Sequence, residues 1–444
     1  MKPSVSIMLA GISLWTAVAS GQDAQPKAAR AGGLDRQSDH GNDLWSREKL
    51  TGNWGGVREG LSAAGLTIDF DATYTFQGVA AGGFDGPFFD LFSDEGDTGN
   101  TFSGDLMLGL DTAKAGLWRG GTFKVRVEGR AGRSVLQRAG SVSAVNNDAL
   151  FPNVVDKFDD DVTAITELTY TQHLCDKVAL FGGLLNTADG DANEIAGSAL
   201  SNTHFLNSAI LYSLVEDATT PNVSLGGGIL FELSEDLSGS FSVFGTQETA
   251  GENPFDHTQG TTLSTEWTLG HKLLERPGAQ TCGFLYGIDG SRANIAANPR
   301  IVLLSILLGR PIPTTTDDTW AFYYNAHQYL HGDSEGGWGM FGRFGISDGN
   351  PNPVKWNAAT GLGGTGLVPH RKHDRWGLGV FYLGLSDEDL LAGLNVGDEI
   401  GGELFYNIAV TPWFHVTLDA QVIDSALPRA DTACVLGVRV HMNF

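Results

Sequence analysis

Four charged residues alternate with apolar residues along one short stretch of the sequence. Lys124, Arg126, Glu128 and Arg130 occupy every second position, and the positions between Lys124 and Glu128 hold valine. A period of two places all four side chains on one face of a β-strand. Ammonium and guanidinium groups donate hydrogen bonds and carboxylates accept them, so this face can bind a solute that both donates and accepts.

Neighbouring stretches add acidic side chains to the same wall. Asp105 and Asp111 share one face of the alternating segment before this strand, and Glu167 lies on the segment after it. Arg343, much later in the chain, is a further candidate for an inward-facing side chain. Adjacent strands lie about 4.8 Å apart, so these charges line one wall together. Such a wall suits the hydroxyls of a neutral sugar, but the charges also fit a second interpretation, in which they pair and brace the sheet.

The strand that carries the four charges is one of about sixteen alternating segments, so we predict an all-β chain. The series starts with Leu66–Gln77, includes Pro299–Gly309 and ends with Ala433–Phe444. Residues 354–368 are an alternative strand, which leaves the count open by one hairpin. Long and short connections alternate between the segments, as in porins, and 348–374 is the exception. The long connections, among them 132–161 and 187–221, are expected on the outer side of the membrane.

The last strand predicts a membrane barrel. Its apolar face ends on Phe444, and aromatic side chains gather at membrane interfaces. An unpaired strand edge cannot lie in lipid, so Leu66–Gln77 must pair with the last strand and close the ring. We therefore expect a transmembrane antiparallel β-barrel of about 16 strands with a short helix, residues 57–64, before the first strand.

The N-terminus predicts export. Residues 1–20 have the pattern of a signal peptide, with Lys2 before an apolar run and small residues after it. Residues 21–49 are a polar, flexible periplasmic lead-in, and residues 50–444 form the barrel domain. No later apolar run approaches the roughly 18 residues of a helical span. Three cysteines are too few for a disulfide framework, and packed or lipid-facing thiols are favoured over one disulfide.

Three motifs occur in order and resemble one family. They are Leu50-Thr-Gly-Asn-Trp-Gly-Gly-Val-Arg58 before the first strand, the block from Gly361 to Val380, and the closing strands from Glu403 to Phe444. Together they are similar to the carbohydrate-selective porins of the OprB type, over about residues 45–444. The resemblance implies passive, sugar-preferring diffusion of mono- and small oligosaccharides across the outer membrane of a Gram-negative cell.

This interpretation makes further expectations about function. The net charge of −24 argues against a nucleic-acid partner. No cofactor, metal or catalytic residue is expected, because no spacing indicates a glycosidase, a hydrolase or a calcium loop. The expected partners are small sugars, outer-membrane lipid and the outer-membrane assembly machinery, reached through the C-terminal strand. A monomer and a homotrimer both remain open. The functional alternatives are a general or other-solute porin, a secreted soluble all-β carbohydrate-binding protein, and a barrel whose loops act as an adhesin or receptor.

Overall fold

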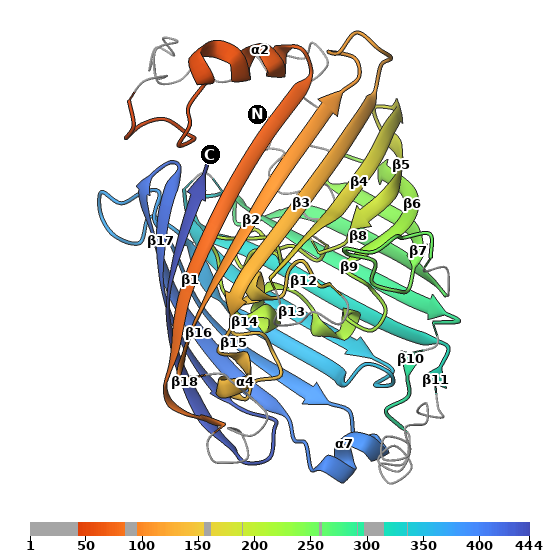
Figure 1. Cartoon of the computed structure of the whole chain (residues 1–444), viewed down its shortest axis with the longest axis vertical. Helices are drawn as coiled ribbons and strands as arrows, with labels where there is room; N and C mark the ends of the chain where they lie inside the picture. Colours follow the sequence, from red (N-terminus) through yellow and green to blue (C-terminus); the bar gives the residue numbers. More distant parts are fainter. Residues whose placement is uncertain are drawn as a thin grey trace.

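The protein is a closed antiparallel β-barrel of sixteen strands (Figure 1). A computed structural model describes residues 43–84, 96–154, 161–188, 190–256, 260–290, 292–296, 315–334 and 336–444. The predicted signal peptide and most of the predicted lead-in lie outside these residues. The barrel strands are β1 Leu66–Phe84, β2 Thr98–Asp111, β3 Gly121–Arg133, β4 Val162–Cys175, β5 Val178–Asn186, β6 Val223–Glu232, β7 Leu237–Gly245, β8 Thr261–Leu273, β9 Arg276–Ile288, β12 Thr319–His331, β13 Trp338–Ser347, β14 Val354–Thr365, β15 Arg375–Leu385, β16 Glu399–Thr411, β17 Phe414–Asp424 and β18 Ala430–Asn443.

Short elements complete the described chain. The two-residue strands β10 Arg292–Ala293 and β11 Thr315–Thr316 pair outside the barrel. The helices are η3 Trp54–Gly56, α2 Val57–Ala63, α4 Leu136–Ala139, η4 Asn147–Ala149, α5 Ser208–Leu211, η5 Leu214–Glu216 and α7 Asp389–Leu394. None of the helices in the described ranges is long and apolar enough to cross a bilayer.

The predicted closure is confirmed, because β1 pairs with β18 from Asp71↔Asn443 to Phe84↔Ala430. Around the rest of the ring every strand pairs with its neighbour in the barrel order, and β9 pairs directly with β12. Both ends of the described chain lie at one end of the barrel, which we call the terminus end (Figure 1). The opposite end, the loop end, carries the longer connections.

The strand count is confirmed, but one member of the predicted set is different. Residues 354–365 form β14, the strand that was only an alternative, and this resolves the exceptional segment 348–374 into two ordinary connections. The predicted strand Pro299–Gly309 lies outside the described residues. Alternation in β14 is weak because its inner face is partly glycine. A Cβ on Gly361 would lie 2.7 Å from the Phe341 ring, so only a small residue fits there.

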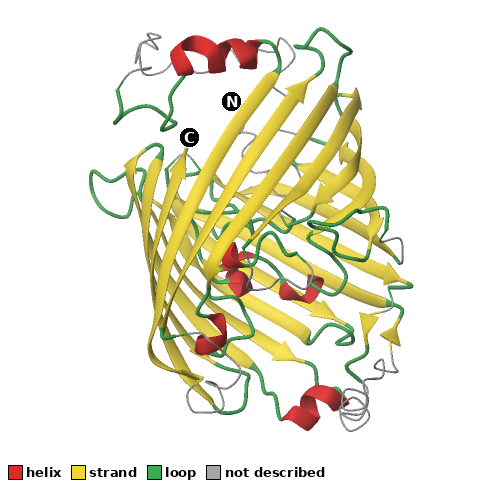
Figure 2. Cartoon of the chain, in the orientation of Figure 1, coloured by secondary structure: helices red, strands yellow, loops and turns green. Residues whose placement is uncertain are grey.

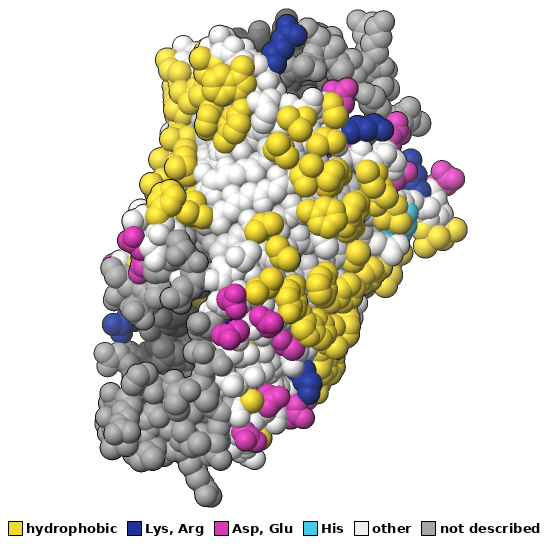
Figure 3. All heavy atoms as spheres, turned by 90° about the vertical axis from the view of Figure 1, so that its right-hand side faces the viewer, with side chains coloured by type: hydrophobic (Ala, Val, Ile, Leu, Met, Phe, Trp, Pro, Cys, Tyr) yellow, Lys and Arg dark blue, Asp and Glu magenta, His cyan; other side chains and the backbone are white. Residues whose placement is uncertain are grey.

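The outer face of the barrel is apolar. Large side chains that alternate with buried ones are exposed on many strands, and they include Phe76, Leu168, Val243, Leu404 and Leu436. Figure 3 shows hydrophobic side chains spread over much of the described surface on one side of the barrel. A surface of this size faces the hydrocarbon of a bilayer rather than water. The alternative of a secreted soluble protein is therefore wrong.

The N-terminal segment holds the seam between β1 and β18. The Arg58 guanidinium on α2 donates to the main-chain oxygen of Phe444 at 2.8 Å and to that of Gly52 at 3.1 Å. The Phe444 ring packs on Phe70 of β1 with centroids 5.1 Å apart, and its N–H donates to the Phe70 carbonyl. Arg58 of the Trp-Gly-Gly-Val-Arg motif therefore fastens the N-terminal segment to the end of the last strand.

Two connections from the loop end fold into the barrel. Loop A consists of residues 134–154 after β3, and loop B consists of residues 187–222, without residue 189, between β5 and β6. Loop A contains α4 and η4, and loop B contains α5 and η5, which lie against the inner faces of β12–β15 (Figure 2). The sequence predicted both as external loops, so their inward path is a correction. The reason is the apolar content of loop B, which needs a buried surface.

The cysteines are unpaired, as favoured from the sequence. Cys175 is exposed at the end of β4. Cys282 on β9 and Cys434 on β18 are half-buried.

Candidate functional site

The predicted charged wall exists, and its central members pair with one another. The Arg126 guanidinium Nε lies 2.9 Å from a Glu128 carboxylate oxygen and 3.3 Å from one of Asp105. Asp105 lies opposite Glu128 in the β2–β3 register, which places both carboxylates beside Arg126. Loop residues cover this part of the wall, because Asp148 and Asn202 line the small remaining gap in front of it. For these three residues, bracing describes the structure better than lining.

The two ends of the charged row differ. Lys124 Nζ lies 3.7 Å from a Glu167 carboxylate oxygen, and both side chains are partly exposed inside the barrel. Arg130 is buried and donates from Nη1 to the Ala149 carbonyl of loop A at 2.8 Å. Lys124 and Glu167 therefore border open space, while Arg130 holds a loop.

Two predicted lining residues have other roles. Asp111 ends β2, and its carboxylate accepts from the N–H groups of Ala113 and Lys114 at 2.9 and 3.1 Å, so it organises a turn at the terminus end. Arg343 does point inward from β13, but its side chain is fully buried against Asp191 of loop B, with Nη1 2.7 Å from the carboxylate. Burial raises the pKa of Asp191, and the Arg343 guanidinium opposes that shift.

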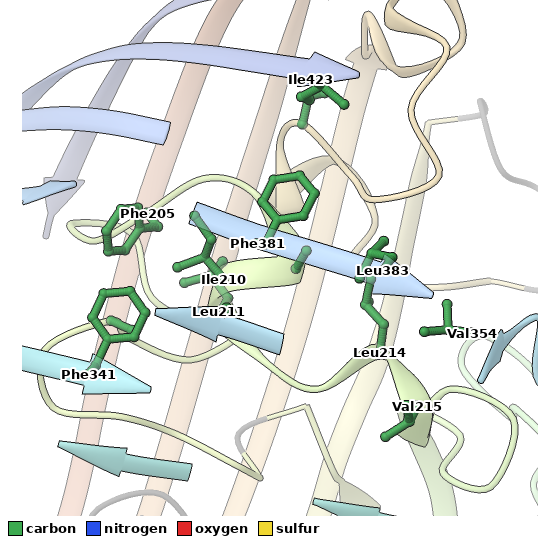
Figure 4. Close-up of a cluster of buried hydrophobic side chains, with 14 of the residues drawn as sticks. Phe205, Ile210, Leu211, Leu214, Val215, Phe341, Val354, Phe381, Leu383 and Ile423 are labelled. Carbon is green, nitrogen blue, oxygen red and sulfur yellow. The ribbon is translucent and has the colours of Figure 1, made fainter. Parts of the chain in front are cut away.

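Loop B fills the barrel on the side of β12–β17. Phe205 packs edge-on against Phe405 and Phe341, with ring centroids 4.8 and 5.5 Å apart. Ile210, Leu211, Leu214 and Val215 continue the same cluster toward Phe381 and Leu383 of β15 (Figure 4). This half of the interior is a hydrophobic core rather than a water-filled lumen.

Polar residues of the same inner wall are bonded to loop backbone. Asn325 donates to the carbonyls of Asp191 and Ala192, and Asn352 donates to those of Leu214 and Val215. Arg439 donates to the His204 carbonyl, and both Gln77 and Gln421 donate to the Val145 carbonyl. Glu399 accepts from the main chain of residues 142 and 143, and Glu403 accepts from the main chain of residues 206 and 207. Buried backbone N–H and C=O groups need hydrogen-bond partners, and the side chains of the barrel wall provide these partners for loops A and B.

Open space remains on the opposite side, between loop B and β4–β9. A cavity of about 140 Å³ lies there, well above the roughly 10–15 Å³ that one water molecule needs. Its lining is rich in hydroxyl groups and carboxylates. Hydroxyls come from Thr169, Ser240, Ser242 and Ser264, carboxylates from Glu167, Glu216 and Glu266, and aromatic rings from Phe181, Phe244 and Tyr323.

The cavity can hydrogen-bond a polyhydroxyl solute from several sides. Hydroxyls donate and accept, carboxylates accept, and aromatic rings offer an apolar face. The Tyr323 hydroxyl donates to Glu266, which fixes both side chains. Burial, together with the carboxylates of Asp191, Glu266 and Asp217, holds the pKa of Glu216 well above its usual range, and Arg343 opposes this. No lysine or arginine is among the described residues that line the cavity, and Lys124 lies 3.7 Å from the lining carboxylate of Glu167.

Of the predicted residues, Glu167 alone belongs to this lining. The lining members on β7, β8 and β12 were missed. A signal for two of them was present, because Ser238, Ser240 and Ser242 alternate along β7 with the exposed Phe241 and Val243. That alternation gives the inward direction. It does not say which inward face stays open, since that depends on the path of loop B.

The described residues contain no group of three or more histidine, cysteine or carboxylate side chains arranged to hold a metal ion. The geometry offers a cavity inside the barrel that is lined by hydrogen-bonding groups.

Comparisons with known proteins identify the family. The family model described as carbohydrate-selective porin, OprB family, matches residues 100–444. The high-pH structure of Pseudomonas putida OprB is similar with a TM-score of 0.75 and 20% identity, over 90% of this chain and 99% of that chain. The low-pH structure of the same protein has a TM-score of 0.56 and 18% identity, over 90% and 99% of the two chains. A comparison with curated proteins gives no match.

At these identities the two structures establish the fold alone, and the family match carries the function. Family and fold point to a channel rather than an enzyme, and to a multi-pass barrel of the outer membrane. The chain belongs to the carbohydrate-selective porin family of the OprB type.

Proposed function

We propose that this sugar porin passes neutral mono- and small oligosaccharides into the periplasm through the cavity between loop B and β4–β9. The observation that carries the proposal is the lining of that cavity, where hydroxyls, carboxylates and aromatic rings face one space. Flux needs no cofactor or energy source, because a barrel of this size conducts passively.

Among the residues predicted from the sequence, Lys124 and Glu167 are proposed to contact solute. The proposed role of four others is structural. Three of them brace the barrel wall by pairing with one another, namely Asp105, Arg126 and Glu128, and Arg130 holds loop A. The residues proposed in addition are Ser240, Ser242 and Glu266.

The test is the double substitution Ser240→Ala with Ser242→Ala. Sugar block of single-channel current should weaken, because two neutral hydrogen bonds contribute about 1–3 kcal/mol together, which is roughly 5- to 150-fold in the half-blocking concentration. Ion conductance should stay the same or rise slightly. The matched control is Val243→Ala on the lipid-facing side of β7, which should leave block unchanged. Undiminished block in the double variant would favour a general porin, in which this face selects nothing.

We also propose that the assembly machinery recognises the closing strand through its terminal aromatic. Support comes from the contact of Phe444 with Phe70, which places the ring at the seam of the barrel. Deletion of Phe444 should reduce the yield of heat-modifiable barrel while export to the periplasm continues. A normal yield of inserted protein would contradict this role.

A further inference from the structure

Two buried glutamates on β16 each hold one of the loops that fold into the barrel. Glu399 receives Ser141 Oγ at 2.9 Å, Ser143 N at 3.0 Å and Ser143 Oγ at 2.7 Å on one oxygen, and Val142 N at 2.7 Å on the other. All of these donors belong to loop A. The Glu399 side chain has no exposed surface.

Glu403 makes the same kind of contact with loop B. One carboxylate oxygen accepts from Leu206 N at 2.7 Å and the other from Asn207 N at 2.8 Å. Because Glu399 and Glu403 are four residues apart on one strand, both point to the same inner face. The wall thus presents two carboxylates in a row, each matched to a different loop.

Gln421 of β17 lies opposite Glu403 and contacts both loops. Its side-chain amide donates to the Val145 carbonyl of loop A at 2.8 Å and accepts from Asn207 Nδ2 of loop B at 3.1 Å. The loops also bond directly to each other, through Asn147 N to the Leu206 carbonyl at 2.9 Å and Ser208 N to the Ala144 carbonyl at 3.0 Å. Loops A and B therefore form one body that is fastened to β16 and β17.

The two glutamates make several of these attachments. Glu399 accepts four hydrogen bonds from loop A, and Glu403 accepts two from the main chain of loop B. The β16 backbone is fixed on both sides by its ladders with β15 and β17, so the two side chains project from a rigid support. Loop B then forms one wall of the solute cavity, through Glu216 and Thr220. A shift of loop B would change the width of that cavity directly.

We propose that Glu399 and Glu403 are positioning residues of the channel, which hold loops A and B against β16 and so set the width of the solute path. Glu399 acts on loop A and Glu403 acts on loop B. The proposal rests on the proposed function only in placing the solute path beside loop B, and its test uses ions rather than sugars.

The test uses the full-length protein with Glu399→Gln and Glu403→Gln, each inserted in planar bilayers. A glutamine keeps the shape but replaces one acceptor oxygen with a donor that faces a loop N–H, so the loop is released. Conductance should rise roughly twofold or more, because a sixteen-stranded barrel without filling leaves an aqueous channel. Leu404→Ala, on the lipid-facing side of the same strand, is the matched control and should keep the parent conductance.

Hydrogen exchange separates the two carboxylates. Peptides over residues 141–143 should exchange faster in Glu399→Gln, and peptides over residues 206–207 should exchange faster in Glu403→Gln. If a glutamine variant does not assemble, Glu399→Asp or Glu403→Asp retains the charge but shortens the reach, and the same exchange change is expected. Unchanged exchange in both variants would overturn the attachment, and faster exchange at parent conductance would overturn the role in setting the width. If sugar block disappeared while conductance and exchange stayed unchanged, the two glutamates would act on the sugar itself, which would overturn the positioning role and leave the proposed sugar channel standing.

Discussion

Arg343→Met tests whether an inward-facing charge of this barrel braces a loop or lines the path. The Arg343 guanidinium lies 2.7 Å from the Asp191 carboxylate, and its Nη2 donates to the Gly197 carbonyl at 3.0 Å. Both members of the pair are almost fully buried. Methionine keeps the length of the side chain and removes the charge and the donors, so the Asp191 carboxylate stays in loop B without its cation.

The magnitude follows from the burial of the pair. Removing one partner of a buried ion pair costs about 3–5 kcal/mol, because the remaining charge is uncompensated. At 1.36 kcal/mol for each factor of ten, this reduces the equilibrium for docking of loop B roughly 150- to 5,000-fold. The amide hydrogens of residues 190–213 should exchange faster by up to that factor, and the barrel should unfold at a lower temperature on a heat-modifiability gel.

A double variant makes the result specific to the pair. Arg343→Met with Asp191→Asn removes both charges, so it should recover much of the lost stability. Arg119→Met, an exposed arginine in a turn at the terminus end, is the control for loss of one positive charge. If Arg343→Met changed ion selectivity without faster exchange in loop B, Arg343 would line the path and the bracing interpretation would be refuted.

Two further predictions concern charge. Glu266→Gln should lower the preference for potassium over chloride at least fivefold in reversal-potential measurements, since one charge about 4 Å from a passing ion contributes about 1–4 kcal/mol, and an unchanged ratio would place the ion path elsewhere. Burial raises the pKa of Asp148 to about 6, with Arg439 opposing it, and raises the pKa of Glu248 to about 7, with backbone hydrogen bonds opposing it. Because these values lie above the roughly 4 of an unfolded carboxyl, the stability they contribute is present at low pH and is lost as the pH rises through about 6–7. The solubilised barrel should therefore melt at a higher temperature at pH 5 than at pH 8, and Asp148→Asn should reduce that difference, whereas an identical difference in the variant would exclude Asp148 as a cause.

The sequence was sufficient for the barrel wall. Alternation in β3 and β18 placed Arg126 and Arg439 inside and Val438 outside, because a strand has a strict period of two. Because an unpaired strand edge cannot lie in lipid, the first and last strands were predicted to pair, and the structure confirms this pairing. Where packing on the inner face demanded small residues, as at Gly361 beside Phe341 and at Gly363 beside Ile195 of loop B, the alternation weakened and the strand was harder to identify.

Only the tertiary structure decided which inner face meets solute. Arg343 and Glu167 both point inward, yet Arg343 is sealed beneath loop B and Glu167 borders the cavity. The difference arises from contacts between segments far apart in the chain, such as Phe205 with Phe405 and Leu206 with Glu403. A local period reports the direction of a side chain relative to its own strand. It carries no information about a loop that crosses the barrel to cover that side chain, because burial of the loop depends on the whole inner surface it meets.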